Sequence, residues 1–223
     1  MDKKVITQKI LDIGRRIWQR EYVAANDGNI TVKINDDEFL TTATGVSKGF
    51  MTEEMIITVN GKGDVIEDNP KFKPSSEVKM HMEVYKMRPD VGAVVHAHPP
   101  YATAFAVLGQ PLDKFILPEA IITLGVVPVA KYATPSTMEI PESIRPYLDK
   151  GDAFLLQNHG ALTVGVDLQT AYFRMETLEH YAKILHLAQS AGEIKCIEGK
   201  ELEDLIKIRE KLNVPGRVSF DKD

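Results

Sequence analysis

Strand-like and helical segments alternate along the whole chain, and this alternation limits the fold more than any other feature. Residues 29–45 hold two β-rich runs around the polar turn Asn35-Asp36-Asp37, which predicts a hairpin. Residues 55–67 predict a second hairpin, with its turn at Asn-Gly-Lys-Gly. Paired strands mixed with helices are typical of an α/β fold that has a mostly antiparallel or mixed central sheet flanked by helices.

The helical segments are recognised by apolar residues that recur at helical spacing. The first of them, residues 5–23, places isoleucines on one face, at Ile6, Ile10, Ile13 and Ile17. We expect the other helices at 75–88, 101–108, 167–191 and 199–212, and further strands within 91–99, 121–133 and 152–165. Because no obvious linker or internal repeat interrupts this pattern, we expect residues 1–223 to form a single domain.

The composition excludes several classes of protein. The chain has 223 residues and a net charge of −5 at pH 7, and it has no Lys/Arg cluster of the kind that binds nucleic acid. Its single cysteine, Cys196, rules out an intrachain disulfide and suits a reducing compartment. No apolar run approaches the roughly 18 residues of a membrane span, and the N-terminus does not have the pattern of a signal peptide. We therefore expect a cytoplasmic protein without nucleic-acid or membrane partners.

Two histidines stand one residue apart at the end of an apolar strand, in the segment VVHAHPP of residues 94–100. Side chains two apart on a strand lie on the same face, with Cα atoms about 6–7 Å apart, so His96 and His98 could converge on one ion. Pro99 and Pro100 end the strand and place the pair at the rim of the sheet. The pattern fits either two core histidines or two metal ligands, because neutral imidazole is a common ligand.

A third histidine, His159, ends another apolar strand in the segment QNHG of residues 157–160. The glycine permits a sharp turn, although an ordinary β-turn has the same pattern. A catalytic divalent metal needs three protein ligands and an open position, and these three histidines would supply three nitrogens. Such a set suits Zn²⁺, and Mn²⁺, Co²⁺ or Fe²⁺ can occupy the same ligands.

Glu77, in the segment PSSE of residues 74–77, is the best candidate for proton transfer. Serines followed by a glutamate are also ordinary helix capping. The hydroxyls of Ser75 and Ser76 and the free N–H groups of that helix start form a candidate phosphate site. Small polar loops at 28–30 and 41–45 could add further donors, although each alone is more often a plain turn.

Taken together and in order, these segments resemble the class II aldolase/adducin family, which includes L-fuculose-phosphate aldolase and L-ribulose-5-phosphate 4-epimerase. The resemblance runs from the N-terminal helix to about residue 190 and rests on GN at 28–29, TATG at 42–45, PSSE at 74–77, HAHPPYATA at 96–104 and QNHG at 157–160. It implies a nine-stranded, mainly antiparallel sheet between helical layers. It also implies a homotetramer with active sites near the subunit interfaces.

The same resemblance implies a role for each site residue. A zinc or similar divalent ion would be held by His96, His98 and His159, with Glu77 as the displaceable fourth ligand and the catalytic acid/base. The phosphate of a sugar substrate would be bound by Gly28, Asn29, Thr44, Gly45, Ser75 and Ser76. A divalent ion suits cleavage of a ketose 1-phosphate to dihydroxyacetone phosphate and an aldehyde, because it stabilises the enediolate as a Lewis acid. A Schiff-base route is disfavoured, since nothing in the sequence places Lys48 or Lys131 in an apolar pocket.

The glutamate of the SSE motif favours an aldolase over the pentulose-phosphate epimerases of the family, which usually carry aspartate there. A departure is that the segment 113–125 contains no tyrosine, where the fuculose-phosphate aldolases that this chain resembles place a catalytic one. Glu119 stands near that place, and we expect it to contribute to substrate recognition or proton transfer. The alternatives are an epimerase, dehydratase or decarboxylase of a phosphorylated sugar, or a non-catalytic, adducin-like interaction module.

Overall fold

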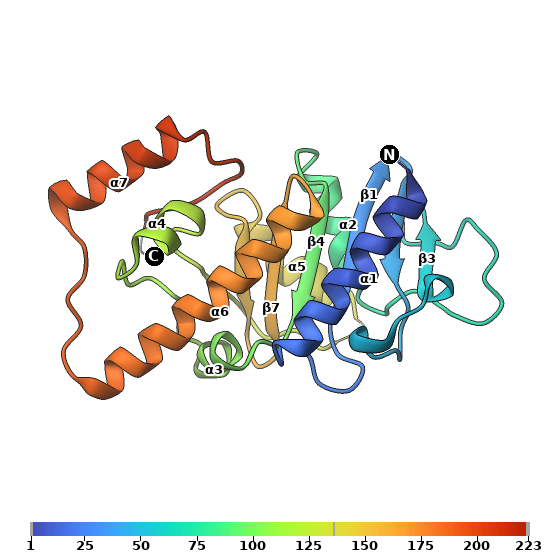
Figure 1. Cartoon of the computed structure of the whole chain (residues 1–223), viewed down its shortest axis with the longest axis horizontal. Helices are drawn as coiled ribbons and strands as arrows, with labels where there is room; N and C mark the ends of the chain where they lie inside the picture. The colour runs from blue at the N-terminus through green and yellow to red at the C-terminus, as the bar shows by residue number, and fades with distance from the viewer. Residues whose placement is uncertain (1, 136, 222–223) are drawn as a thin grey trace.

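The computed structural model describes residues 2–135 and 137–221, and its centre is a seven-stranded sheet of order β3-β2-β1-β4-β7-β6-β5 (Figure 1). All neighbouring strands pair antiparallel except β5 and β6, which are parallel. The strands are β1 (Asn29–Asn35), β2 (Glu38–Thr42), β3 (Ile56–Val59), β4 (Ala93–Ala97), β5 (Val129–Ala130), β6 (Ala153–Leu156) and β7 (Gly160–Gly165). The prediction of a mostly antiparallel sheet is confirmed.

Helices cover both faces of the sheet. One face packs on α1 (Lys3–Gln19), α3 (Pro100–Leu108) and α6 (Leu168–Ala191), and the other on α2 (Val78–Met87) and α5 (Glu139–Ile144). Near the C-terminus, α7 (Gly199–Lys211) packs with α4 (Pro118–Thr123). Short 3₁₀ turns complete the chain, at η1 (Lys48–Phe50), η2 (Glu53–Met55) and η3 (Arg145–Tyr147). Within the described ranges, no helix is both long and apolar enough to cross a bilayer.

The strand predictions are correct where the runs are long. The hairpin around 35–37 is present as β1 and β2, whereas the segment 55–67 forms only β3 and an isolated bridge between Val59 and Val65. The segment 121–133 contributes only the two-residue β5, and its first residues belong to α4. The sheet of the described residues therefore has seven strands, and the expectation of nine is wrong.

The pleat of β4 determines which way the histidines face. Val95 and Ala97 belong to the core beneath α1 and α6, while Val94 belongs to the core beneath α2. Because side chains alternate along a strand, His96 lies on the α2 face with Val94. His96 is paired with Asn29 of β1 on one side and with Leu162 of β7 on the other.

A buried ionic network fixes the C-terminal part of the chain to the sheet. Asp152 accepts from Arg88 at 2.7 Å and from Arg174 at 2.9 Å, and these three side chains are 1–4% exposed. The backbone N–H of Arg217 also donates to Asp152, at 2.9 Å. Since each charge has an opposite charge in contact, the network offsets the cost of burying it.

Candidate metal site and active site

His96, His98 and His159 meet at one point although they come from two strand ends. His96 lies on β4, His98 follows it, and His159 lies in the turn between β6 and β7. Nε2 of His98 lies 3.1 Å from Nε2 of His96, and one ring nitrogen from each of the three histidines lies within 4.8 Å of the others. Nitrogen ligands of a tetrahedral zinc ion, at about 2.0–2.1 Å from it, are about 3.3 Å apart. The rings are therefore arranged so that they could share one ion.

A hydrogen bond on the outer side of the His96 ring defines its tautomer. Nδ1 of His96 lies 2.9 Å from the carbonyl oxygen of Ala161, which can only accept, so this nitrogen carries the proton. Nδ1 of His98 lies 3.4 Å from Oδ2 of Asp27, an ion-pair distance. Nε2 of His96 is then unprotonated and lies 3.1 Å from Nε2 of His98. A lone pair of His96 directed toward the other two rings is what a metal ligand needs, so the donor set fits a metal ion.

Glu77 immediately precedes α2, and its carboxylate faces the histidines. The helix begins at Val78 and not at 75 as expected, so Glu77 occupies the N-cap position instead of the first turn, and its side chain makes no capping bond within the described part of the chain. Oε1 lies 3.2 Å from Nε2 of His159, and Oε2 lies 3.4 Å from Nε2 of His96. Oε1 is buried, and no described residue donates a hydrogen bond to it. A buried carboxylate oxygen without a donor is suited to face a cation.

Burial keeps two of the histidines neutral. It lowers the pKa of His96 well below the ordinary value of 6.5, and the neighbouring His159 and His98 lower that pKa further. Burial also lowers the pKa of His159, although Glu77 and Asp27 raise it to a smaller extent. Neutral imidazole is the form that binds a metal, so these shifts favour ligation at neutral pH.

Two loops that carry the candidate phosphate residues are joined beside Glu77. The N–H of Thr44 donates to the carbonyl of Lys73 at 2.9 Å, and the N–H of Ser75 donates to the carbonyl of Thr42 at 3.1 Å. Ser75 itself is buried, and its hydroxyl accepts from the N–H of Glu77 at 3.3 Å. The exposed members of the set are Thr44, Gly45 and Ser76.

Gly28 and Asn29 lie at the start of β1, which pairs with β4 beside His96. Gly28 has a φ of +74°, and a Cβ there would lie 2.9 Å from the carbonyl oxygen of His96, so a side chain does not fit. Nδ2 of Asn29 donates to Oε2 of Glu77 at 2.8 Å. In this structure Asn29 therefore orients the carboxylate.

Two buried polar residues beside the site do not follow from the sequence pattern. His81 of α2 is fully buried, its Nδ1 lies 2.7 Å from the hydroxyl of Thr31, and burial lowers its pKa to about 3. Lys48 is 1% exposed, and burial lowers its pKa to about 8. Its Nζ donates to the carbonyls of Val46 at 2.7 Å and Asn26 at 3.2 Å, so Lys48 anchors a loop. The sequence carries no apolar pattern around Lys48 that would reveal this burial.

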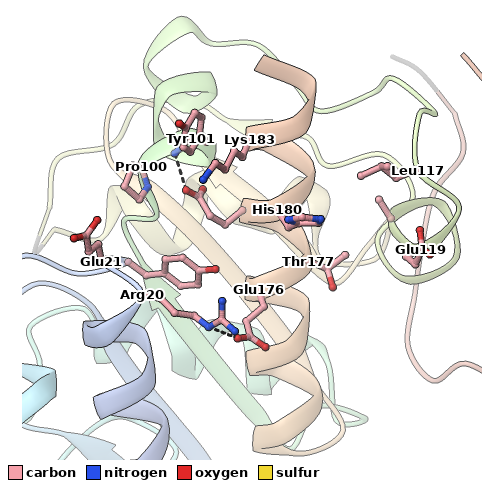
Figure 2. A pocket seen from close by; sticks show the side chains of 13 residues that line it. Arg20, Glu21, Pro100, Tyr101, Leu117, Glu119, Glu176, Thr177, His180 and Lys183 are labelled. Atoms are coloured by element: carbon pink, nitrogen blue, oxygen red, sulfur yellow. Dashed lines mark hydrogen bonds and ion pairs between the residues drawn. The ribbon is translucent and has the colours of Figure 1, made fainter. Parts of the chain in front are cut away.

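Glu119 lies on α4, in a separate pocket of about 740 Å³ between α4, α6 and the end of α1 (Figure 2). The pocket is polar, with Arg20 paired to Glu176 and Glu179 accepting from the N–H of Tyr101 at 3.0 Å. Glu119 is exposed, and no described hydrogen bond or ion pair joins its side chain to the histidines. The pocket lining includes Pro100, two residues after His98 in the chain, but none of the three histidines and not Glu77.

Comparison with known proteins shows the family of the chain. The sequence profile of the Class II Aldolase and Adducin N-terminal domain matches residues 8–186, so the chain belongs to this family. An L-fuculose phosphate aldolase of Methanococcus vannielii is 37% identical over 183 residues, which cover 82% of this chain and 97% of that protein. A 3-oxo-tetronate 4-phosphate decarboxylase of Haemophilus influenzae is 31% identical over 201 residues, which cover 88% of this chain and 93% of that protein.

The fold has counterparts among solved structures. An L-fuculose 1-phosphate aldolase superposes with a TM-score of 0.85 at 30% identity, covering 96% of this chain and 98% of that one. YgbL of Klebsiella pneumoniae, described as a putative aldolase/epimerase/decarboxylase, superposes with a TM-score of 0.84 at 28% identity over 92% of this chain and 99% of that one. The family of the chain is therefore shown, and its relatives are named for different reactions.

Proposed function

We propose that this protein is a metal-dependent sugar-phosphate aldolase that cleaves a ketose 1-phosphate to dihydroxyacetone phosphate and an aldehyde. One observation carries the proposal: three imidazole nitrogens and the carboxylate of Glu77 converge on one point. The joined loops that carry Thr44 and Ser75, the candidate phosphate site, lie beside it. His96, His98 and His159 would hold the ion, and Glu77 would be its displaceable fourth ligand. Zn²⁺ suits this donor set, with Mn²⁺, Co²⁺ and Fe²⁺ as alternatives.

The bound ion would supply Lewis-acid stabilisation of the negative charge that develops on the substrate oxygens during carbon–carbon cleavage. The protein residues would do the remaining work. Glu77 would move a proton at the carbon from which the aldehyde departs, and Asn29 would hold its carboxylate in place through the 2.8 Å hydrogen bond. The hydroxyls of Thr44, Ser75 and Ser76 and the N–H group of Gly45 would bind the phosphate, with Gly28 allowing close approach of the backbone.

A decarboxylase is the second candidate, and it is favoured by the relatives that are named 3-oxo-tetronate 4-phosphate decarboxylase. Loss of CO₂ from that substrate leaves the enediolate of dihydroxyacetone phosphate, the same fragment that an aldolase produces. The two reactions differ in the leaving group, which is CO₂ in one and an aldehyde in the other. Cleavage to an aldehyde needs a base that removes the proton of the hydroxyl on the departing carbon, whereas loss of CO₂ from a carboxylate does not, and the absence of a tyrosine in 113–125 therefore bears on this choice.

Glu119 is our candidate for recognition of the leaving group or for proton transfer from its hydroxyl during cleavage. Its support is its place in a polar pocket whose lining includes Pro100, two residues after His98 in the chain. We also propose a homotetramer, in which a neighbouring subunit would complete the active site. Light scattering of the purified protein would test this assembly.

The test screens for the products of both candidate reactions. The protein is incubated with dihydroxyacetone phosphate and a panel of aldehydes, and separately with 3-oxo-tetronate 4-phosphate, before and after removal of metal by a chelator. We expect metal-dependent formation of a ketose 1-phosphate. Metal-dependent release of CO₂ without any aldol product would replace the aldolase by the decarboxylase. No metal-dependent product in either direction would contradict both.

A further inference from the structure

The carboxylate of Asp27 lies behind His98, on the side away from the point that the three histidines share. Its Oδ2 is 3.4 Å from Nδ1 of His98, while Nε2 of the same ring faces His96 at 3.1 Å. Asp27 is not among the residues proposed above as metal ligands or phosphate contacts. Those roles therefore do not account for its contact with the ring of His98.

The loop that carries Asp27 is fixed to the end of β4 from both sides. Ahead of Asp27, the carbonyl of Tyr22 accepts from the N–H of His98 at 2.8 Å. After it, the backbone of Gly28 packs against the carbonyl of His96. The N–H of Asp27 also donates to the carbonyl of Ala24 at 2.9 Å. The carboxylate is thus held beside the imidazole by backbone contacts on each side.

Lys48 supports the same loop from inside the protein. Its buried Nζ donates to the carbonyl of Asn26, next to Asp27, and to the carbonyl of Val46. A buried ammonium group is costly, and both of these hydrogen bonds and the nearby negative charge of Asp27 offset that cost. The loop is therefore held from inside the protein by a hydrogen bond at Asn26, the residue before Asp27.

We propose that Asp27 is a positioning residue of the metal site, whose carboxylate accepts the Nδ1 proton of His98, holds Nε2 toward the ion and raises the affinity for a divalent cation. A carboxylate behind a ligand imidazole fixes the tautomer and makes the metal-binding nitrogen more basic. Asp27 also adds a negative charge that, with Glu77, balances the two positive charges of the ion. The inference rests on the metal-dependent function proposed above.

The experiment measures the Zn²⁺ dissociation constant of the metal-free protein by competition with a chromophoric chelator at fixed pH. Three variants are compared with the natural protein: Asp27→Ala, Asp27→Asn and, as a matched control, Asp36→Ala. Asp36 is an exposed aspartate at the opposite end of β1, paired with Lys33 at 2.8 Å. The Asp27 side chain is 41% exposed, so its replacement leaves the core intact.

Asp27→Ala is expected to weaken Zn²⁺ binding about 10–100-fold, and Asp27→Asn less, because the amide oxygen still accepts from Nδ1 without the charge. The Co²⁺-substituted Asp27→Ala protein is expected to show an altered visible spectrum, which a purely structural effect at a distance would leave unchanged. Asp36→Ala is expected to bind as the natural protein does. If Asp27→Ala binds Zn²⁺ within about twofold of the natural protein, the role of Asp27 is refuted while the metal site stands. If the natural protein binds no divalent ion, the inference and the proposed function both fail.

Discussion

Replacing Gly160 by alanine should damage the metal site through a single added methyl group. Gly160 follows His159 and begins β7. A Cβ at this position would lie 2.5 Å from Cδ2 of His98 and 2.6 Å from the carbonyl oxygen of Ala97. Carbon atoms in contact normally stay about 3.5–4.0 Å apart, so the imidazole would have to move by about 1 Å. Cδ2 is bonded to Nε2, and the proposed ligand atom would move with it.

The expected size of the effect follows from this geometry. Overpacking of a buried position costs about 1–3 kcal/mol of unfolding free energy, and here one of the two clashing groups is backbone that cannot rotate away. Metal–ligand distances tolerate errors of only about 0.2 Å, so a shift of about 1 Å should release His98 from the ion. A misplacement of about 1 Å can also cost about 100-fold in rate.

The assays are chemical denaturation for the unfolding free energy and chelator competition for Zn²⁺ affinity, each on Gly160→Ala and on the control Gly151→Ala. A Cβ at Gly151 would meet no atom of the described residues within 4 Å. We therefore expect Gly151→Ala to stay within about 0.5 kcal/mol of the natural protein and to bind metal normally. The reasoning is refuted if Gly160→Ala matches Gly151→Ala in both stability and metal affinity.

Three further predictions concern other parts of the molecule. Glu119→Gln should lower kcat/KM on the true substrate without changing bound metal, and an unchanged kcat/KM in steady-state assays would remove Glu119 from the mechanism. His81 has a folded-state pKa of about 3 against an ordinary value of 6.5, so the unfolded chain binds the extra proton and stability is lost as pH falls from 6.5 toward 3. His81→Leu should therefore flatten the pH dependence of the unfolding free energy by up to about 1.4 kcal/mol per pH unit, measured by urea denaturation between about pH 4 and about pH 6; an unchanged slope would contradict this. Asp152→Asn leaves Arg88 and Arg174 without their shared carboxylate, and thermal and urea unfolding should show a loss of about 3–5 kcal/mol, whereas a loss below about 1 kcal/mol would mean that the network does not stabilise the fold.

The sequence pattern was sufficient where neighbouring residues carry the signal. His96 and His98 are two apart on a long apolar strand, so strand geometry alone places both rings on one face. The turn before Gly160 likewise reveals that His159 lies at a strand end. What the pattern could not give is the convergence of these segments, which depends on the pairing of β4 with β7 and the docking of α2 on the same face.

The residues that the sequence did not reveal owe their roles to partners far along the chain. Lys48 is buried because the loops at 24–28 and 46–48 close over it, and its neighbours in sequence are polar or small. Asp27 reads as an ordinary turn residue in AANDGN, and its contact with His98 depends on left-handed backbone at Ala25 and Gly28. The short β5 was overestimated because a run of apolar residues does not separate a strand from a buried helix such as α4.

The central claim, that His96, His98 and His159 hold one divalent ion together with Glu77, is tested most directly by X-ray absorption at the zinc edge on protein loaded with one equivalent of Zn²⁺. The account predicts a spectrum with three imidazole nitrogens and oxygen ligation at about 2.0–2.2 Å. A spectrum with fewer than three imidazoles, or protein that does not retain the ion, would contradict it.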